Sequence, residues 1–317
     1  MTHYSLPKSI LSIFLMFFSL SILGQDFSGK ITYSFEYRPK DTSTKVKDLV
    51  VDMPTDSVVY TIKNGHYQSQ RYFEGKCIEF YTYSNSTKKM YYTTEDRDYF
   101  IYFFPHDQRY SSPILTEKQK DEKQILGYTT SLVTTIVDGM EMLNFYSPEI
   151  RVEPASFEGH AFGGWYELLK RNNGAIPLKT ATNYYDHYEV KTATKIEFFD
   201  LDDTFFDVPE SQEIVASRES LDELAHAEEP TPETYYCYMS KIEEIADKMI
   251  QGKNYNYVLR MVIDTDGSVS HIKAINSDYL GFDKVAEKIV EECNLEFHPG
   301  KINDLPQRAE IFFPLGL

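Results

Sequence analysis

One segment near the end of the chain decides how its last quarter folds. Residues 257–274 have the sequence YVLRMVIDTDGSVSHIKA. The first seven of them are largely apolar on both faces except at Arg260, as expected for a strand that is covered on at least one side. Asp266 and Gly267 separate this strand from a second β-prone run, and Asp-Gly favours a hairpin because Gly accepts the positive φ of the turn. The segment therefore predicts two antiparallel strands joined at the structural turn Asp266-Gly267.

The residues after this hairpin predict a helix and one more strand. Between residues 279 and 292 apolar side chains recur at helical spacing, and charged side chains fill the opposite face. Pro299 and Gly300 then form a second structural turn. Residues 308–313 are a last β-prone run, which ends at Pro314. The order strand, strand, helix, strand predicts a small α+β domain.

This region resembles the C-terminal domain of the TonB family. The matching motifs are IDTDGSV at residues 263–269, DKVA at 283–286 and FHPG at 297–300. The chain departs from the family pattern at Phe297, where Trp is usual, and at Asp304, where Gly is common. The resemblance implies a three-stranded antiparallel sheet with helices over residues 235–317.

The same resemblance implies a binding function. TonB-like domains are understood to hold a short peptide of an outer-membrane transporter, which adds as a strand to the edge of their sheet. The last strand is therefore expected to bind an envelope protein or transporter peptide, mainly through its backbone. The implied partner-binding residues are Arg308, Ala309, Glu310, Ile311, Phe312 and Phe313. The alternative is that this edge is covered by the chain itself or by a second copy.

The first 24 residues predict a secretory signal peptide. Lys8 is a basic n-region, residues 10–23 are almost wholly apolar, and Gly24 supplies a small residue for cleavage. The apolar run is shorter than the roughly 20 residues of a membrane-spanning helix, and a retained anchor is the alternative. The mature chain is thus expected in the cell envelope, as a periplasmic or secreted protein without a membrane span.

The net charge limits the class of partner, and the number of cysteines limits the disulfide bonds. The formal net charge is -17, and loss of Lys8 with the signal changes it to -17 - 1 = -18. Because such a surface repels nucleic acid and anionic lipid head groups, no nucleic-acid partner is expected. The three cysteines, Cys77, Cys237 and Cys293, allow at most one disulfide bond. Cys237 with Cys293 is the favoured pair because both lie in one domain, but the sequence leaves open whether they are bridged.

Residues 25–210 predict an antiparallel, β-rich domain. Apolar and polar side chains alternate between residues 31 and 37, as in a half-buried strand, and Lys63-Asn64-Gly65 marks a second hairpin. Further β-prone runs lie at residues 77–83, 89–93, 99–104, 127–137, 141–146 and 184–199, with a short helical piece at 165–169. Strands at such short intervals predict a half-barrel or curved sheet. The whole chain is therefore expected to be α+β.

A weak resemblance to secreted β-rich families of the GLPGLI and LolA-like type rests on three short motifs. These are ILGY at residues 125–128, YSPE at 146–149 and DTFFDVP at 203–209. The resemblance implies an alternative function, a periplasmic carrier of lipid or another apolar ligand in the half-barrel. The aromatic residues that permit an apolar cavity, or equally a solid core, are Tyr33, Phe35, Tyr81, Tyr83, Tyr91, Phe100 and Phe103.

Residues 211–234 predict a linker, because they are acidic, contain Pro230 and Pro232, and have few large apolar side chains. The chain contains no Gly-x-Ser-x-Gly, His-Glu-x-x-His or Cys-x-x-Cys motif and no phosphate-binding loop. We therefore expect a non-catalytic binding protein without a cofactor. An acidic cluster at residues 200–207 suits a solvated loop or a divalent cation, and the solvated loop is favoured, so no metal site is expected.

Overall fold

The structure is a computed structural model of the 317-residue chain that describes residues 26–46, 49, 54–107, 114–137, 139–246, 257–275 and 282–315. The predicted signal peptide, residues 1–24, lies outside the described residues. The chain is mostly β with a few helices, and it divides into two compact units. The N-terminal unit comprises Met1–Lys88 and Pro105–Asp207, and the C-terminal unit comprises Lys89–Phe104 and Val208–Leu317.

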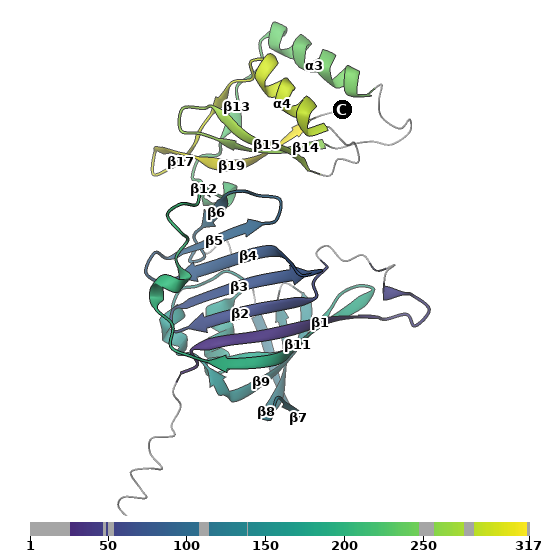
Figure 1. Ribbon diagram of the computed structural model, residues 1–317, viewed down its shortest axis with the longest axis vertical. Coiled ribbons are helices and arrows are strands. Elements are labelled where there is room, and N and C mark those ends of the chain that lie inside the picture. Colours follow the sequence, from purple (N-terminus) through teal and green to yellow (C-terminus); the bar gives the residue numbers. More distant parts are fainter. Residues whose placement is uncertain are drawn as a thin grey trace, which may run out of the picture. The chain divides into compact units, whose positions relative to one another are not determined.

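The N-terminal unit is a curved antiparallel sheet (Figure 1). Its strands follow the order β4-β3-β2-β1-β11-β10-β9-β8-β7, and each is antiparallel to its neighbours. Their bounds are Gly29–Pro39 (β1), Ser57–Lys63 (β2), His66–Phe73 (β3), Lys76–Ser84 (β4), Ile114–Ile125 (β7), Tyr128–Val137 (β8), Met140–Arg151 (β9), Ala175–Asn183 (β10) and His187–Phe198 (β11). The curved antiparallel sheet expected for this part of the chain is therefore confirmed.

Strand pairing decides which side chains share the inner face of this sheet. Ile31, Tyr60, Ser69 and Tyr81 lie directly opposite one another across β1 to β4, so their side chains point to the same face. The short helices η4 (Pro154–Phe157) and α2 (Trp165–Arg171) also place Phe157 and Leu169 in the core, where both are fully buried. A third short helix, η5, spans Asp203–Phe206.

The C-terminal unit contains strands in the order β15-β14-β19-β12-β6-β5. Their bounds are Lys89–Thr94 (β5), Phe100–Phe103 (β6), Ile214–Ala216 (β12), Tyr257–Ile263 (β14), Val269–Ile275 (β15) and Ala309–Leu315 (β19). The helices are η6 (Arg218–Ser220), α3 (Pro232–Ala246) and α4 (Phe282–Glu292). Two small ladders pair β13 (His226–Ala227) with β16 (Phe297–His298), and β17 (Gly300–Ile302) with β18 (Leu305–Gln307).

The predicted hairpin, helix and closing strand all form in this unit. β14 is antiparallel to both β15 and β19, and Leu259, Met261 and Ile311 join Ile289 of α4 in one buried cluster. Gly267 has φ +87°, and a Cβ there would lie 2.3 Å from the Phe297 carbonyl oxygen, so the predicted left-handed turn position is confirmed.

The other predicted turn has a different geometry. Pro299 separates β16 from β17, and Gly300 is the first residue of β17. A Cβ on Gly300 would lie 2.4 Å from Leu221 Cδ1 and 3.1 Å from the Ala225 nitrogen. Glycine is therefore required here by the close approach of residues 221–225 rather than by a left-handed turn.

Those approaching residues belong to the predicted linker, residues 211–234, part of which is packed within the C-terminal unit. Val215, Ala216 and Leu221 are buried, and Ala216 pairs with Ala309. The composition of residues 211–234 is acidic, but these few apolar residues are enough to hold it against the sheet of the C-terminal unit.

Residues 89–104 also differ from the expectation. The sequence placed them in the N-terminal β-rich domain, whereas the structure groups them with the C-terminal unit, in which β6 is parallel to β12. Tyr99 of this hairpin is buried with Val215 and Val262. The C-terminal unit is consequently larger than the predicted three-stranded sheet, and its sheet is mixed rather than antiparallel.

The favoured cysteine pair is bridged. Cys237 of α3 and Cys293, which follows α4, form a disulfide bond with a Cα–Cα distance of 5.5 Å. Cys77 is exposed and free. A disulfide bond within one unit, here between α3 and the residue that follows α4, is typical of proteins that fold in an oxidising compartment.

Candidate functional site

The strand to which the sequence assigns partner binding lies inside a sheet. β19 pairs with β14 along its whole length, from Ala309 to Leu315. On its other side Ala309 pairs with Ala216 of β12, and the Ala216 N–H donates to the Arg308 carbonyl oxygen at 2.8 Å. The expected free edge is therefore occupied at its start by the chain itself, which is the alternative that the sequence left open.

Most side chains of the predicted partner-binding set serve the fold. Ala309 and Ile311 are buried, and the Phe313 ring packs on Phe297 with a centroid distance of 5.8 Å. Arg308 forms ion pairs with Glu213 (2.7 Å) and Asp264 (2.6 Å). Phe312 is half-buried.

Glu310 is the centre of a buried ion-pair network. Its carboxylate accepts two hydrogen bonds from Arg97, at 2.7 and 3.0 Å, and one from the Tyr99 hydroxyl at 2.7 Å. Arg260 of β14 lies 3.8 Å from the same carboxylate and donates to Asp96 at 2.7 Å. Burial and the adjacent Glu310 carboxylate raise the pKa of Tyr99. The network holds residues 94–99 against β14 and β19. The Glu310 carboxylate is therefore engaged within the fold rather than presented to a partner.

A short part of the β19 backbone, beyond its pairing with β12, remains available for a partner strand. Because the Arg308 carbonyl faces β12 and strand residues two apart face the same way, the backbone groups of Phe312 and Pro314 face that side too. No described strand pairs with residues 311–315 on that side. Proline has no N–H, so Phe312 supplies the single backbone donor on that side of residues 311–315.

The inner face of the N-terminal unit is the second candidate. At one end its side chains form a solid core around Tyr67, whose hydroxyl lies 2.7 Å from His160 Nε2. Tyr83 and Phe157 pack against Tyr67, with ring centroids 5.3 and 6.3 Å away. Burial and the neighbouring His106 lower the pKa of His160 to about 3, so this imidazole is neutral at physiological pH. This end is a closed, hydrogen-bonded aromatic core.

The rest of the inner face is not closed in the same way. Phe35, Tyr60 and Tyr81 point inward, yet their side chains are only half-buried. Burial nevertheless raises the pKa of Tyr60 and Tyr81, because the phenolate form is poorly solvated there. We call the inward-facing residues Tyr33, Phe35, Tyr60, Tyr81 and Lys191 the inner aromatic face. Its partly exposed rings can contact an apolar molecule.

Charged side chains accompany these rings. Arg71 of β3 forms an ion pair with Glu79 of β4 at 2.8 Å and lies 6.0 Å from the centre of the Phe35 ring. Glu189 of β11 is half-buried, and burial raises the pKa of its carboxyl group. The inner face therefore combines aromatic surface with a few poorly hydrated charges.

The sequence did not single out the charged residues of this face. The strand at residues 184–199 was predicted, and its alternation places Glu189, Lys191 and Ala193 on one side. Which side faces inward depends on the pairing of Lys191 with Phe35. That pairing joins residues 156 positions apart (191 - 35), so it has no local signal.

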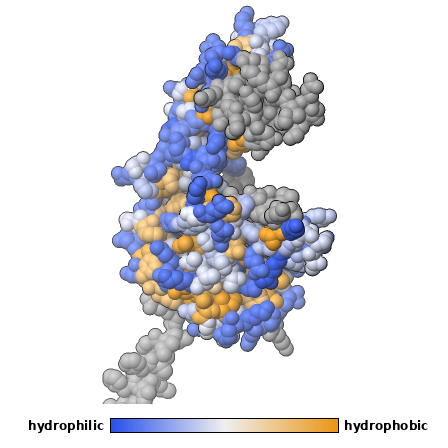
Figure 2. Space-filling model, turned by 45° about the vertical axis from the view of Figure 1, so that its right-hand side comes forward, coloured by the Kyte–Doolittle hydropathy of each residue, from blue (hydrophilic) through white to orange (hydrophobic). Residues whose placement is uncertain are grey.

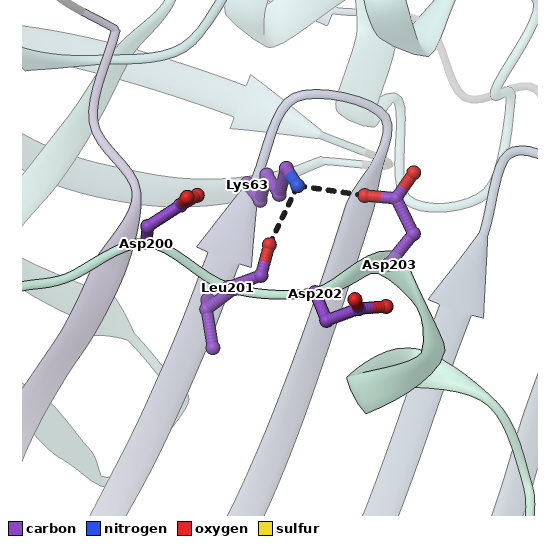
Figure 3. A pocket seen from close by; sticks show the side chains of 5 residues that line it. All are labelled: Lys63, Asp200, Leu201, Asp202 and Asp203. Carbon is purple, nitrogen blue, oxygen red and sulfur yellow. Dashed lines mark hydrogen bonds and ion pairs between the residues drawn. The ribbon is translucent and has the colours of Figure 1, made fainter.

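The acidic cluster near residue 200 lines a surface depression of about 460 Å³ (Figure 3). Lys63 Nζ donates to the Leu201 carbonyl at 2.6 Å and lies 2.7 Å from an Asp203 carboxylate oxygen. Asp202 caps η5 by accepting from the Thr204 N–H at 2.9 Å. A lysine ammonium thus already occupies the position of a cation between these groups, and the arrangement supports the solvated-loop interpretation.

No group of three or more His, Cys, Asp or Glu side chains among the described residues could hold a metal ion. No helix in the same part of the chain is long and apolar enough to cross a membrane. Figure 2 shows hydrophobic residues at the surface of the N-terminal unit, where exposed large apolar side chains include Phe198, Phe199 and Phe205.

Comparison with known proteins gives only distant similarity. No protein-family model and no curated protein matches the chain. Among solved structures, PNGF-II in the C2 space group is similar with a TM-score of 0.40 and 12% identity over 74% of this chain. PNGF-II in the P21 space group has a TM-score of 0.37 and 10% identity over the same share. The chain spans less than half of PNGF-II, 43% and 44% of its length in the two structures.

A LolA superfamily protein, NE2245 from Nitrosomonas europaea, is also similar, with a TM-score of 0.27 and 10% identity. The match covers 58% of this chain and 91% of that protein. Similarities at these scores assign no function, so the functional argument depends on the residues of the chain itself.

Proposed function

We propose that this chain is a non-catalytic binding protein of the cell envelope whose N-terminal unit carries a lipid or another apolar ligand on the inner aromatic face. One observation carries the proposal: Phe35, Tyr60 and Tyr81 point inward on a curved sheet but remain partly exposed. Aromatic side chains in such a position gain free energy when an apolar molecule covers them, about 25 cal/mol per Å² of apolar surface removed from water.

Several features support an envelope location for the mature chain. The first 24 residues have the pattern of a secretory signal, and Cys237 and Cys293 form a disulfide bond. In the C-terminal unit the strand order β15-β14-β19 with α4 supports the proposal that this unit is TonB-like. On this proposal the C-terminal unit docks or tethers the carrier at an envelope protein.

Peptide capture by strand addition is the second candidate function. The observation that favours it is the backbone of Phe312 and Pro314, which extends beyond the end of the three-residue β12. A partner peptide would either continue the position of β12 or replace it. Titration of the mature chain with envelope peptides from transporter N-termini tests this reading, and absence of binding by all of them would remove it.

Ligand carriage is tested by a change of charge on the inner aromatic face. Trp165 is the single tryptophan, and its ring centre lies 6.2 Å from that of Tyr60, so its fluorescence reports on this region. We expect oleyl alcohol to bind the mature chain and to change this fluorescence. Tyr81→Glu should weaken binding about tenfold or more, because an apolar ligand would remove water from the new carboxylate.

Tyr72→Glu is the matched control. Tyr72 lies on the outer face of the neighbouring strand β3, is half-buried, and donates to Gln70 at 2.8 Å. The affinity for oleyl alcohol should stay within about twofold of the parent, since the ligand does not reach that face. Equal loss of binding in the two folded variants, or no binding by the parent, would contradict ligand carriage on the inner face.

A further inference from the structure

Lys191 of the inner aromatic face forms no ion pair with a carboxylate of the described residues. Lys191 of β11 pairs with Phe35 of β1 and Thr180 of β10, so its side chain shares the inner face with the aromatic rings. The ammonium nitrogen lies 4.9 Å from the centre of the Tyr33 ring. Lys191 is half-buried, and no carboxylate of the described residues lies within ion-pair distance of its ammonium group.

The other ionisable groups on this face have partners of their own or lie beyond ion-pair distance of Lys191. Arg71 is paired with Glu79, and His187 is paired with Asp186 at 2.6 Å. Glu189 is the remaining carboxyl group; burial raises its pKa, and its negative charge acts favourably on Lys191 from beyond ion-pair distance. Tyr33 donates its hydroxyl hydrogen to the Pro177 carbonyl at 2.9 Å. None of these groups therefore neutralises Lys191 directly.

An unpaired ammonium among aromatic rings is costly because it has lost part of its hydration. Burial, together with the nearby Arg71 charge, lowers the pKa of Lys191 to about 8. The group is still mostly protonated at pH 7, so it keeps a positive charge without an ion-pair partner. The cation–π contact with Tyr33 offsets only part of this cost.

We infer that the N-terminal unit selects amphiphiles with an anionic head group, carboxylate or phosphate, and that Lys191 binds this head group while Phe35, Tyr60 and Tyr81 contact the apolar chain. This inference rests on the proposed carriage of an apolar ligand. It adds the chemical class of the ligand. Lys191 is the residue that determines specificity, because its positive charge binds the anionic head group and the neutral rings cannot.

The experiment compares three ligands that share one apolar chain: oleate, oleyl phosphate and oleyl alcohol. We expect the parent to bind at least one of the two anions about tenfold more tightly than the alcohol at pH 7, as one charge-assisted contact allows. Lys191→Met should reduce this preference to about twofold or less and leave the affinity for the alcohol unchanged. Comparison of oleate with oleyl phosphate identifies the head group.

Two variants control for folding and for surface charge. Lys191→Arg keeps the positive charge and should retain the preference for anions. Lys195→Met removes a lysine of the same strand that is exposed and paired with Glu197 at 2.8 Å, and it should behave as the parent. A melting temperature close to the parent value confirms that each variant is folded.

The outcomes separate the inference from the function on which it rests. Equal affinity of the parent for the alcohol and both anions would overturn the inference and leave ligand carriage intact. A preference for anions that survives in Lys191→Met, or is lost equally in Lys195→Met, would also overturn it. Failure of all three ligands to bind the parent would overturn ligand carriage first and this inference with it.

Discussion

Glu310→Leu should lower the free energy of unfolding of the C-terminal unit by about 3–5 kcal/mol. The Glu310 carboxylate is 2% exposed and accepts hydrogen bonds from Arg97 and the Tyr99 hydroxyl. Its removal leaves the half-buried Arg97 guanidinium without its carboxylate partner, and Arg260 loses a charge 3.8 Å away. The measurement is chemical denaturation in which hydrogen exchange, read in peptides of the C-terminal unit, reports the unfolding of that unit.

The control for this change is Glu36→Leu. Glu36 pairs with Arg38 at 2.6 Å on the surface of the N-terminal unit, where an ion pair contributes little. We expect a change within about 0.5 kcal/mol. Trp165 fluorescence reports on the N-terminal unit, and this unit should unfold at the same denaturant concentration in both variants. A loss below about 1 kcal/mol in Glu310→Leu would show that the network does not hold residues 94–99 against β14 and β19.

Removal of the disulfide bond should destabilise the same unit by about 2–4 kcal/mol, because the bond closes a long loop and restricts the unfolded chain. The two cysteines are 56 residues apart. The test is the double variant Cys237→Ser with Cys293→Ser, compared by denaturation with Cys77→Ser. Cys77 is exposed and free, so its replacement should leave stability nearly unchanged. Three reactive thiols in the denatured, unreduced parent would contradict the assignment.

Elements that depend on a local sequence pattern could be predicted. The alternation of apolar and polar side chains between residues 31 and 37 predicted a strand, and these residues lie in β1. Gly65 and Gly267 both have positive φ in hairpin turns, as predicted. β7 (Ile114–Ile125) was missed because its sequence is rich in charge on both faces. It is the last strand in the sheet order of the N-terminal unit, and charged side chains are common at such a position. β10 (Ala175–Asn183) was also missed.

The extent of the C-terminal unit could not be predicted from local patterns. Residues 89–104 join a unit whose other residues begin at Val208, more than 100 positions later. A signal was nevertheless present: Arg260 and Glu310 each interrupt an apolar strand. Charged residues at positions expected to be buried require partners, and Arg97 and Asp96 supply them. The sequence does not say where in the chain such partners lie.

The candidate site was predictable only in part. The aromatic residues Tyr33, Phe35 and Tyr81 were selected from composition, but Tyr91, Phe100 and Phe103 of the same set belong to the C-terminal unit. Tyr60 and Lys191 complete the inner aromatic face through strand pairing, which depends on residues far apart in the chain. The closing strand was located correctly, but its free edge was not, because the three-residue β12 is too short to be recognised in an acidic segment.

Native mass spectrometry of the mature chain, purified from its own envelope without detergent exchange, tests ligand carriage most directly. The account predicts that part of the protein carries an additional mass of lipid size, which is released on denaturation and identified by its fragments. The same adduct should be absent from Tyr81→Glu and present in Tyr72→Glu. A chain found only at its bare mass, or one that carries a transporter peptide instead of a lipid, would contradict the proposal.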